Sequence, residues 1–453
     1  MLPRLLTACA IVFVCGVAGV FAVGAHELHA TADALEAQPR LDLGVRTHTT
    51  GGTRGAARTI LLIGSDRRAG AARRDARSDT MMLVRLNPRA QAVTVLSVPR
   101  DLQVSIPGRG TAKLNAAYAY GGAALTVKTL QRTLGTDIDH VIDVDFAGFR
   151  ALVDELGCVY TDVDRRYFNR NLGTAATNYA AIDIQAGYQR LCGADALDYV
   201  RYRHGDHDLV RAARQQDFLR QARAQVGVQQ LLGDRHALLT LLGAHTRTDL
   251  RGSKQLTALA KLALDATGKP VQQIRFPATI GPSYVYASRA QVRSAVNRFL
   301  HPQVAKRRAT TKPAGRPRST GLVDAAPPRS LRARIPFLYP GRRLKRATYD
   351  SARAYTLTDA GGTRHRAYRL SIRAGVSEFY GVQGTDWADP PLLADPDERR
   401  RLGRRTFELF YDGKRLRRVA LRTPRGTYWV SNTLTRSLTN AQMLAIARSL
   451  RRL

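Results

Sequence analysis

Lysine, acidic residues and cysteine are all scarce in this chain of 453 residues. Only 36 Asp and Glu stand against 71 Lys and Arg, and only nine of those bases are lysine, so the net charge of +35 is almost entirely arginine. Arginine suits phosphate-bearing partners because its planar guanidinium binds phosphate oxygens through two hydrogen bonds. Nucleic acid, an anionic membrane surface or a bias toward arginine codons would fit the same excess. Charge alone therefore selects no partner.

The sequence also lacks internal repeats and nucleic-acid-binding motifs. Its length and 44% hydrophobic content suffice for two or three domains with a real core, which excludes a wholly disordered or collagen-like chain.

Of four cysteines, Cys9 and Cys15 lie in an N-terminal apolar run, which leaves Cys158 and Cys192. In an oxidising compartment this pair predicts a disulfide, with two unpaired buried thiols as the alternative. Neither has metal-ligand spacing with a partner, so no zinc site is predicted.

One stretch only is apolar enough to span a membrane. Leu5–Ala25 contains no charged residue, and its 21 residues are long enough for one helical crossing. Arg4 precedes this run and Glu27 follows it, which predicts an N-terminus in the cytoplasm and a chain outside it from residue 26 on. An uncleaved anchor is favoured over a signal peptide because the run exceeds a usual signal core, although Ala22–Gly24 resembles a cleavage site.

Composition divides the chain into five parts. The predicted parts are an anchor at 1–25, an extracytoplasmic stalk at 26–57, a main folded domain at 58–300, a basic Pro-rich linker at 301–334 and a smaller α+β domain at 335–453. In the main domain, apolar runs predict strands at 59–63, 81–86, 92–98 and 141–144. Helical spacing predicts helices at 113–134, 146–156, 210–232, 234–245, 252–266 and 288–299. Strands that alternate with helices predict an α/β or α+β fold.

The C-terminal part has its own pattern. Alternating runs predict a sheet with strands near 367–372, 407–411, 419–421 and 427–430, followed by a helix at 440–450. Trp387 beside Gly381–Gly384, and the pair Tyr428-Trp429, are candidates for stacking on sugars. The favoured alternative is that these aromatics form the core of a small domain.

Charged clusters concentrate between residues 64 and 216. They are Gly64-Ser-Asp66 with Arg68, Arg77-Ser-Asp79-Thr80, Pro99-Arg100-Asp101, Lys113-Leu-Asn115, and 201–204 with Asp208, Arg211, Arg214, Gln215 and Gln216. Acidic residues at strand ends are candidate ligands for a hard divalent cation, and converging arginines suit a diphosphate. Any one cluster is more often a turn, a helix cap or a solvated face. The order and number of the clusters together are what indicate a functional site.

In that order, the segments resemble the LytR-CpsA-Psr family of cell-wall glycopolymer ligases. The similar segments are 60–70, 77–108, 113–122, 138–149 and 195–219. The resemblance implies a central mixed β-sheet flanked by helices, with a hydrophobic channel for a lipid tail. It implies a membrane-anchored transferase acting outside the cytoplasm. Such an enzyme moves a glycopolymer from a polyprenyl-pyrophosphate lipid onto the 6-hydroxyl of muramic acid in peptidoglycan, forming a phosphodiester.

The resemblance also implies roles for single residues. Asp66 and Asp79 match carboxylates that hold Mg²⁺, with Mn²⁺ as a substitute. The implied catalytic residues are Asp66, Arg77, Asp79, Arg100 and Asp101, with Asp101 as the candidate base. The implied pyrophosphate and head-group residues are Arg77, Arg100, Lys113, Arg201, Arg203, Arg211, Arg214 and Gln215. Apolar residues of 123–156 are expected to line the lipid channel, with core packing nearly as favoured.

Two departures from the family pattern coincide. Cys158 stands where a second glycine is expected after Gly157, and Cys192 stands where the Asp of an LDG turn is expected. Their joint appearance supports one disulfide between two adjacent segments. Residues 335–453 do not resemble the additional C-terminal domain of some relatives.

Other function classes stay open at this point. A membrane-tethered, non-catalytic binding or regulatory protein is the main alternative, and hydrolysis of the pyrophosphate would use nearly the same site with water as acceptor. Nucleic-acid binding is not expected, because the chain carries an export segment and no suitable motif. The sequence does not select the polymer, which is a teichoic acid, an arabinogalactan-like glycan, a capsule or another wall polysaccharide.

Overall fold

The computed structural model describes most of the folded chain. The described residues are 41, 43, 56–65, 78–170, 181–202, 208–225, 237, 241, 244–250, 255, 258, 259, 262, 269, 271–274, 276–281, 283–302, 321–328 and 335–453. They fall into two compact units, Met1–Cys158 with Phe218–Arg308, and Val159–Asp217 with Ala309–Leu453. The residues 159–217 therefore pack with the C-terminal part, whereas the domain boundaries expected from composition remain predictions.

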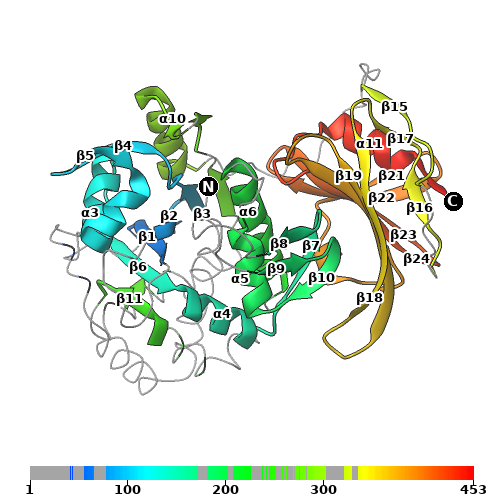
Figure 1. Ribbon diagram of the computed structural model, residues 1–453, viewed down its shortest axis with the longest axis horizontal. Helices are drawn as coiled ribbons and strands as arrows, with labels where there is room; N and C mark the ends of the chain where they lie inside the picture. The colour runs from blue at the N-terminus through cyan, green and yellow to red at the C-terminus, as the bar shows by residue number, and fades with distance from the viewer. Residues whose placement is uncertain are drawn as a thin grey trace. The chain divides into compact units, whose positions relative to one another are not determined.

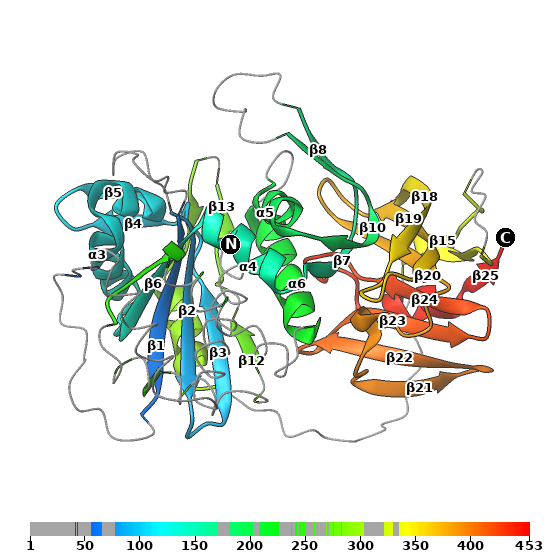
Figure 2. The same cartoon turned by 90° about the horizontal axis from the view of Figure 1, so that it is seen from below.

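A six-stranded mixed sheet forms the centre of the first unit (Figure 2). Its strands, in spatial order, are β11 (Thr246–Thr248), β6 (His140–Asp145), β1 (Arg58–Ser65), β2 (Ser78–Asn87), β3 (Ala92–Ser97) and β12 (Val271–Ile274). The pairs β1–β6 and β3–β12 are parallel, and the other three pairs are antiparallel. The mixed sheet and its four predicted strands are confirmed.

Helices and short hairpins cover this sheet. The helices are α3 (Leu114–Leu134), α4 (Phe146–Glu155) and α10 (Arg289–Leu300), and the hairpins are β4 (Gln103–Ile106) with β5 (Gly110–Lys113) and β13 (Thr279–Ile280) with β14 (Val285–Tyr286). Leu61 and Ile63 of β1 join α3 and α10 in one apolar core. Their neighbours Ile60 and Leu62 point to the opposite face and are also buried. Burial on both faces explains why β1 reads as a continuous apolar run.

Helix α3 contains a break that periodicity did not predict. Gly121 and Gly122 leave the helical region, and Gly122 has φ 62° and ψ −154°, a conformation open essentially to glycine alone. Beyond the break, Ala123, Val127 and Leu130 are buried in the same core as the sheet. These three residues of the segment expected to line a lipid channel therefore pack in the core.

The second unit contains a seven-stranded antiparallel sheet (Figure 1). In spatial order its strands are β18 (Thr348–Thr358), β19 (Arg364–Arg373), β20 (Phe379–Thr385), β24 (Gly426–Ser431), β23 (Arg415–Thr423), β22 (Arg405–Asp412) and β21 (Glu398–Leu402). Helix α11 (Asn440–Arg448) packs on β23 and β24 and begins with a capping box at Thr439. The predicted C-terminal strands and terminal helix are confirmed.

The rest of this unit comes from residues 159–217, from a short helix and from short strands that form separate two-stranded sheets. These elements are β7 (Val159–Val163), β8 (Tyr167–Asn169), β9 (Ile182–Ile184), β10 (Gly187–Leu191), α5 (Gly193–Arg201), the start of α6 (Asp208–Gln225), β15 (Leu322–Asp324), β16 (Leu338–Pro340), β17 (Arg342–Leu344), η2 (Pro391–Leu393) and β25 (Leu450–Arg452). Strand β15 pairs with β17 although it lies inside the predicted linker 301–334. The predicted helices at 234–245 and 252–266 lie largely outside the described residues.

Within the described part of the chain, no helix is long and apolar enough to cross a membrane. The predicted anchor, Leu5–Ala25, lies outside that part.

Candidate active site

The topology of the mixed sheet gathers the predicted motifs at one edge. Ser65, the last residue of β1, is paired with Ser78 at the start of β2 and with Asp145 at the end of β6. On the far side of β2, Met82 is paired with Ser97, the last residue of β3. The chain therefore leaves β1, β3 and β6 at the edge where it enters β2.

Part of the predicted site falls on residues whose side chains are not described. Asp66, Arg77 and Arg203 lie outside the described residues, and Asp79 is described only as a backbone position in β2. Asp66 directly follows Ser65, and Asp79 lies between the partners of Gly64 and Ser65. Carboxylate oxygens are among the donors that Mg²⁺ prefers.

A second predicted group is present with its contacts. Lys113 Nζ lies 3.1 Å from Asp101 Oδ1, and Arg100 Nε lies 3.5 Å from Asp101 Oδ2. The Asp101 side chain is 19% exposed and that of Arg100 is 12% exposed, whereas Lys113 is 40% exposed. One carboxylate thus pairs with two cations that are thirteen positions apart in the sequence. The residues of this triad, Arg100, Asp101 and Lys113, come from two motifs that the sequence analysis singled out.

Backbone hydrogen bonds fix the loop that carries the triad. Asn115 N donates to the Arg100 carbonyl at 2.9 Å, and Leu114 N donates to the Leu102 carbonyl at 2.9 Å. From the other side, Val285 N donates to the Asp101 carbonyl at 2.9 Å. The first turn of α3 has unsatisfied N–H groups, and the loop after β3 supplies acceptors for two of them. The loop is therefore held on two sides by the helix and by β14.

Sequence reasoning missed Asp143. This residue of β6 is fully buried, and it accepts hydrogen bonds from the hydroxyls of Ser65 at 2.8 Å and Tyr118 at 2.6 Å. It therefore joins the end of β1, one residue before Asp66, to α3. The available signal was an acidic residue inside an otherwise apolar strand, which is seldom found without a partner.

Arg214 and Gln215 on α6 are fully buried within the second unit. Gln215 Nε2 donates to the Val200 carbonyl at 2.6 Å, and Arg214 Nη2 donates to the Tyr202 carbonyl. The guanidinium of Arg214 also lies 4.6 Å from the ring centroid of Tyr167 and 5.6 Å from that of Tyr202. The two side chains thus form hydrogen bonds with the backbone carbonyls of the residues before and after Arg201, the last residue of α5.

Arg201 and Arg211 complete the predicted set in the second unit. Arg201 lies in the last turn of α5 and is half-buried, whereas Arg211 is 3% exposed. A cation in the last turn is stabilised by the negative end of the helix dipole. The structure therefore brings Arg201 close to Arg214 and Gln215, and it places Arg100, Asp101 and Lys113 together in the first unit.

The predicted disulfide between Cys158 and Cys192 is confirmed. A carboxylate oxygen of Asp154 lies near both sulfurs, but sulfurs joined in a disulfide are not available as thiolate ligands for a metal ion. Cys158 has φ 67° directly after Gly157 with φ 76°, so both residues adopt the left-handed conformation. That conformation explains why a second glycine is expected at Cys158.

The C-terminal aromatics belong to the core rather than to a sugar-binding face. Tyr428 is 1% exposed and Trp429 is fully buried. Trp387 is half-buried, stacks on His365 with ring centroids 4.9 Å apart, and meets the Tyr160 ring edge-on at 5.4 Å. The favoured prediction for these residues is confirmed.

Comparison with known sequences connects this architecture to named proteins. The model of the LytR_cpsA_psr family matches residues 25–300. TagT of Bacillus subtilis, a polyisoprenyl-teichoic acid–peptidoglycan teichoic acid transferase, is 37% identical over 163 residues, 36% of this chain and 50% of TagT. TagU of Oceanobacillus iheyensis, named for the same activity, is 33% identical over 212 residues, 45% of this chain and 62% of TagU. The regulatory protein MsrR of Staphylococcus aureus is 33% identical over 163 residues, 36% of this chain and 46% of MsrR.

The chain thus spans about half to three fifths of the length of these relatives. A solved structure of TagT bound to LIIa-WTA is 26% identical and covers 58% of this chain and 98% of that chain, with a TM-score of 0.45. The family model matches more than half of the residues, and it includes every motif at the edge of the mixed sheet. The chain therefore belongs to the LytR-CpsA-Psr family.

Proposed function

We propose that the chain is an extracytoplasmic phosphotransferase that moves a glycopolymer from a polyprenyl-pyrophosphate carrier onto the 6-hydroxyl of muramic acid in peptidoglycan. Membership of the family and the activity for which TagT and TagU are named support this proposal. The observation that carries it is the triad of Arg100, Asp101 and Lys113 in the loop after β3, which leaves the sheet on the side where β1 and β6 also end. Two cations fixed at the loop edge of a sheet suit a diphosphate.

In the proposed reaction the muramic acid hydroxyl attacks the phosphorus that bears the polymer. The new P–O bond forms as the bond from that phosphorus to the bridging oxygen breaks, and polyprenyl phosphate leaves. Arg100 and Lys113 would stabilise the charge that develops on the phosphate oxygens. The hydroxyl proton passes to a base or to the leaving phosphate. Because Asp101 already holds Lys113 and Arg100, its geometry favours orienting these cations over accepting the proton.

Asp66 and Asp79 are the residues proposed to hold Mg²⁺ or Mn²⁺. Asp66 follows the last residue of β1 in the sequence, and Asp79 belongs to the part of β2 that is paired with the end of β1, which supports a shared cation. When bound, the metal would neutralise pyrophosphate oxygens. The proposal also places Leu5–Ala25 in the cytoplasmic membrane as a single-pass anchor with the N-terminus in the cytoplasm, because the run is uncharged and preceded by Arg4.

A second candidate is a membrane-tethered protein that binds the lipid-linked polymer and regulates without transferring it. The 33% identity to MsrR, which is named a regulatory protein, favours this alternative. The triad argues for the transferase, because a protein that only binds would not need the orientation that Asp101 imposes on two cations.

The test is a joining assay with the full-length chain in detergent. The chain is incubated with a polyprenyl-pyrophosphate-linked saccharide and a peptidoglycan oligomer, with Mg²⁺ or with EDTA, and mass spectrometry detects the phosphodiester product. We expect metal-dependent joining that Arg100→Ala lowers by about 10²–10³-fold. Arg89→Ala is the matched control, because Arg89 is exposed in the turn between β2 and β3, at the other edge of the sheet.

Three other outcomes decide between the candidates. Release of polyprenyl phosphate without joining would indicate hydrolysis. Lipid binding without turnover would favour the regulatory protein. Equal activity of Arg100→Ala and Arg89→Ala would remove the triad from the proposed site.

A further inference from the structure

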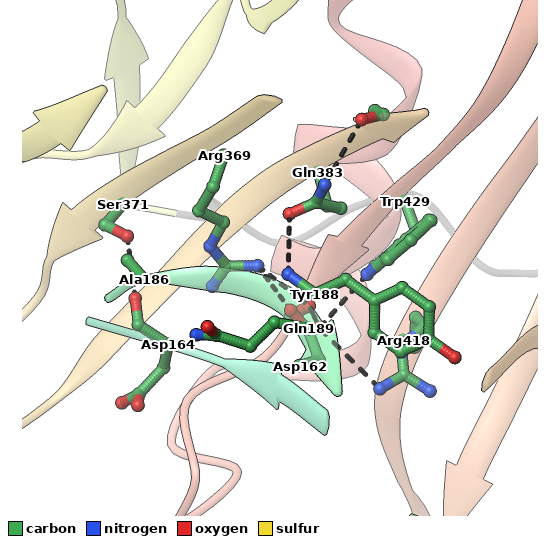
Figure 3. A network of polar contacts seen from close by, with 12 residues as sticks. Asp162, Asp164, Ala186, Tyr188, Gln189, Arg369, Ser371, Gln383, Arg418 and Trp429 are labelled. Carbon is green, nitrogen blue, oxygen red and sulfur yellow. Dashed lines mark hydrogen bonds and ion pairs between the residues drawn. The ribbon is translucent and has the colours of Figure 1, made fainter. Parts of the chain in front are cut away.

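The C-terminal sheet holds residues 159–217 through buried charges. Figure 3 shows Asp162 of β7 among side chains from the sheet. Its carboxylate accepts from Arg369 Nη1 at 3.0 Å and from Trp429 Nε1 at 3.0 Å, and Arg418 Nη2 lies 3.7 Å away. Nearby, the Ser371 hydroxyl donates to the Asp164 carbonyl at 2.7 Å. The paired strands β7 and β10 are therefore held on the sheet by buried charged and polar contacts.

The same sheet also reaches α6. Val210, Ala213 and Asp217 recur at spacings of three and four residues, so they lie on one face of the helix. Leu434, from the loop after β24, packs with Val210 and Ala213 in a small buried cluster. Two residues later, Arg436 Nη2 donates to Asp217 Oδ1 at 2.6 Å, with both side chains under 10% exposed. One face of α6 is thus covered by a single C-terminal loop.

This loop, residues 432–438, is internally fixed. Asn432 Oδ1 accepts from Thr433 N at 2.8 Å and from Leu438 N at 3.1 Å, which closes the loop at its base. Arg436 has φ 60° and donates a second hydrogen bond from Nη1 to the Thr433 carbonyl at 2.8 Å. A left-handed conformation is uncommon for arginine and persists where surrounding contacts determine it.

The charge balance around Arg436 favours its ionised form. Burial lowers the pKa of the guanidinium, but Asp217 and Asp412 outweigh burial, so its pKa is raised. Asp412 Oδ2 lies 3.5 Å from Arg436 Nε. Replacing Arg436 by a neutral residue would remove the cation that is ion-paired with the buried Asp217 and leave its electrostatic interaction with Arg418, which favours displacement of α6.

Contacts continue from α6 to the end of α5. Asp217 is three residues from Arg214 and two from Gln215, and those two side chains hold the carbonyls of Tyr202 and Val200. Arg201 lies between these two carbonyls. A shift of α6 would therefore move Arg201, one of the arginines proposed to contact the pyrophosphate.

We propose that Arg436 is a positioning residue for the lipid-carrier head group, acting through Asp217 and α6 on Arg201. The proposal rests on the proposed function and extends it, because it gives the C-terminal sheet a role in substrate binding. Arg436 itself contacts no substrate in this account. Its effect on Arg201 is transmitted by the ion pair with Asp217 and by the hydrogen bonds from Arg214 and Gln215 to the backbone at the end of α5.

The test compares Arg436→Met with Met443→Ala in the full-length chain. Met443 is fully buried in the apolar core between α11 and the sheet, so its truncation destabilises the same unit and leaves the Arg436–Asp217 pair intact. Two quantities are measured below the unfolding transition of both variants. One is amide hydrogen exchange of 193–202 and 208–225, and the other is the Kd for octaprenyl pyrophosphate.

We expect faster exchange in both segments and about tenfold weaker binding for Arg436→Met, with near wild-type values for Met443→Ala. For Arg436→Lys, the exchange rates and the Kd should lie between those of the wild type and Arg436→Met. An ammonium keeps the positive charge opposite Asp217 but does not make both hydrogen bonds of the guanidinium. If Arg436→Met does not fold, Asp217→Asn breaks the pair from the other side with nearly unchanged shape.

Equal exchange and equal affinity in Arg436→Met and Met443→Ala would overturn the positioning role. So would faster exchange of α6 with unchanged affinity. A wild-type chain that does not bind octaprenyl pyrophosphate would instead refute the proposed function, and the exchange data would still show whether Arg436 holds α6. The two failures are therefore distinguishable.

Discussion

Asp162 on β7 and Arg369 on β19 form an ion pair whose atoms Oδ1 and Nη1 are 3.0 Å apart, with side chains only 2% and 1% exposed. Their positions differ by 207 in the sequence. Arg418 lies on the other side of the same carboxylate, and burial lowers the pKa of Arg418 while Asp162 partly offsets this effect. Asp162 thus compensates Arg369 and, together with Asp217, Arg418, so its removal should be costly.

We predict that Asp162→Asn lowers the free energy of unfolding by about 3–5 kcal/mol, because breaking a buried pair from one side leaves uncompensated charge. Urea unfolding followed by circular dichroism measures the change. Asp350→Asn is the control, since the partner of Asp350, Arg373, is 54% exposed and such pairs contribute about 0–1 kcal/mol. Similar losses in the two variants would contradict the structural importance of the Asp162 network.

The role of Asp101 can be separated from that of a base. If Asp101 orients Lys113 and Arg100, Asp101→Asn lowers kcat but leaves the acidic limb of the pH–rate profile in place. Its effect should also be far from additive with that of Lys113→Met, because the two residues act as a pair. A double-mutant cycle on kcat, with a pH profile for each variant, measures both. Disappearance of the acidic limb in Asp101→Asn would identify Asp101 as the base.

The disulfide gives a prediction with an internal control. Replacing Cys158 and Cys192 together by serine should lower the free energy of unfolding by about 3–4 kcal/mol, the loop-closure value for a ring of about 35 residues. Because Cys158 has φ 67°, the combination of Cys158→Gly with Cys192→Ser should lose about 1 kcal/mol less. Thermal unfolding without reductant compares both with the wild-type chain. Equal losses would mean that the backbone at 158 relaxes when the disulfide is absent.

Buried tyrosines predict loss of stability at high pH. Burial raises the pKa of Tyr380 to about 12, and its hydroxyl accepts a hydrogen bond from Leu344 N at 3.3 Å. The folded state keeps the proton that the unfolded state releases near pH 10, so this contribution is complete below pH 10 and is lost as the pH rises toward 12. We expect the wild-type chain to lose about 2 kcal/mol more than Tyr380→Phe over that range. Urea unfolding at pH 9 and pH 11.5 tests this, and parallel losses would contradict it.

Much of the fold was predictable because its signals are local. The apolar run at 59–63 and the alternation at 427–430 each gave the strand that the structure contains. Turn residues and helical spacing placed α3, α4 and α10 in the same way. The kink at Gly122 was not predicted, because a glycine pair inside a periodic segment does not reveal which backbone conformation it adopts.

The site was predictable in part for a different reason. Resemblance to the family identified Arg100, Asp101 and Lys113, and the structure joins them in one triad. The buried hydrogen bonds from Arg214 and Gln215 to the backbone at the end of α5 were not predicted. Helical spacing shows which residues share a face of a helix, but not which residues that face contacts. Asp143 was missed because its partners, Ser65 and Tyr118, come from two other elements.

The sequence by itself determined the strands β1, β2, β3 and β6, the helices α3, α4 and α10, the motifs of the family and the disulfide between Cys158 and Cys192. Only the tertiary structure decided that residues 159–217 pack with the C-terminal sheet. The contacts responsible, Asp162–Arg369 and Asp217–Arg436, join positions that differ by 207 and 219 in the sequence. Periodicity encodes which side of an element is buried, whereas the partner of a buried charge depends on how distant segments pack together.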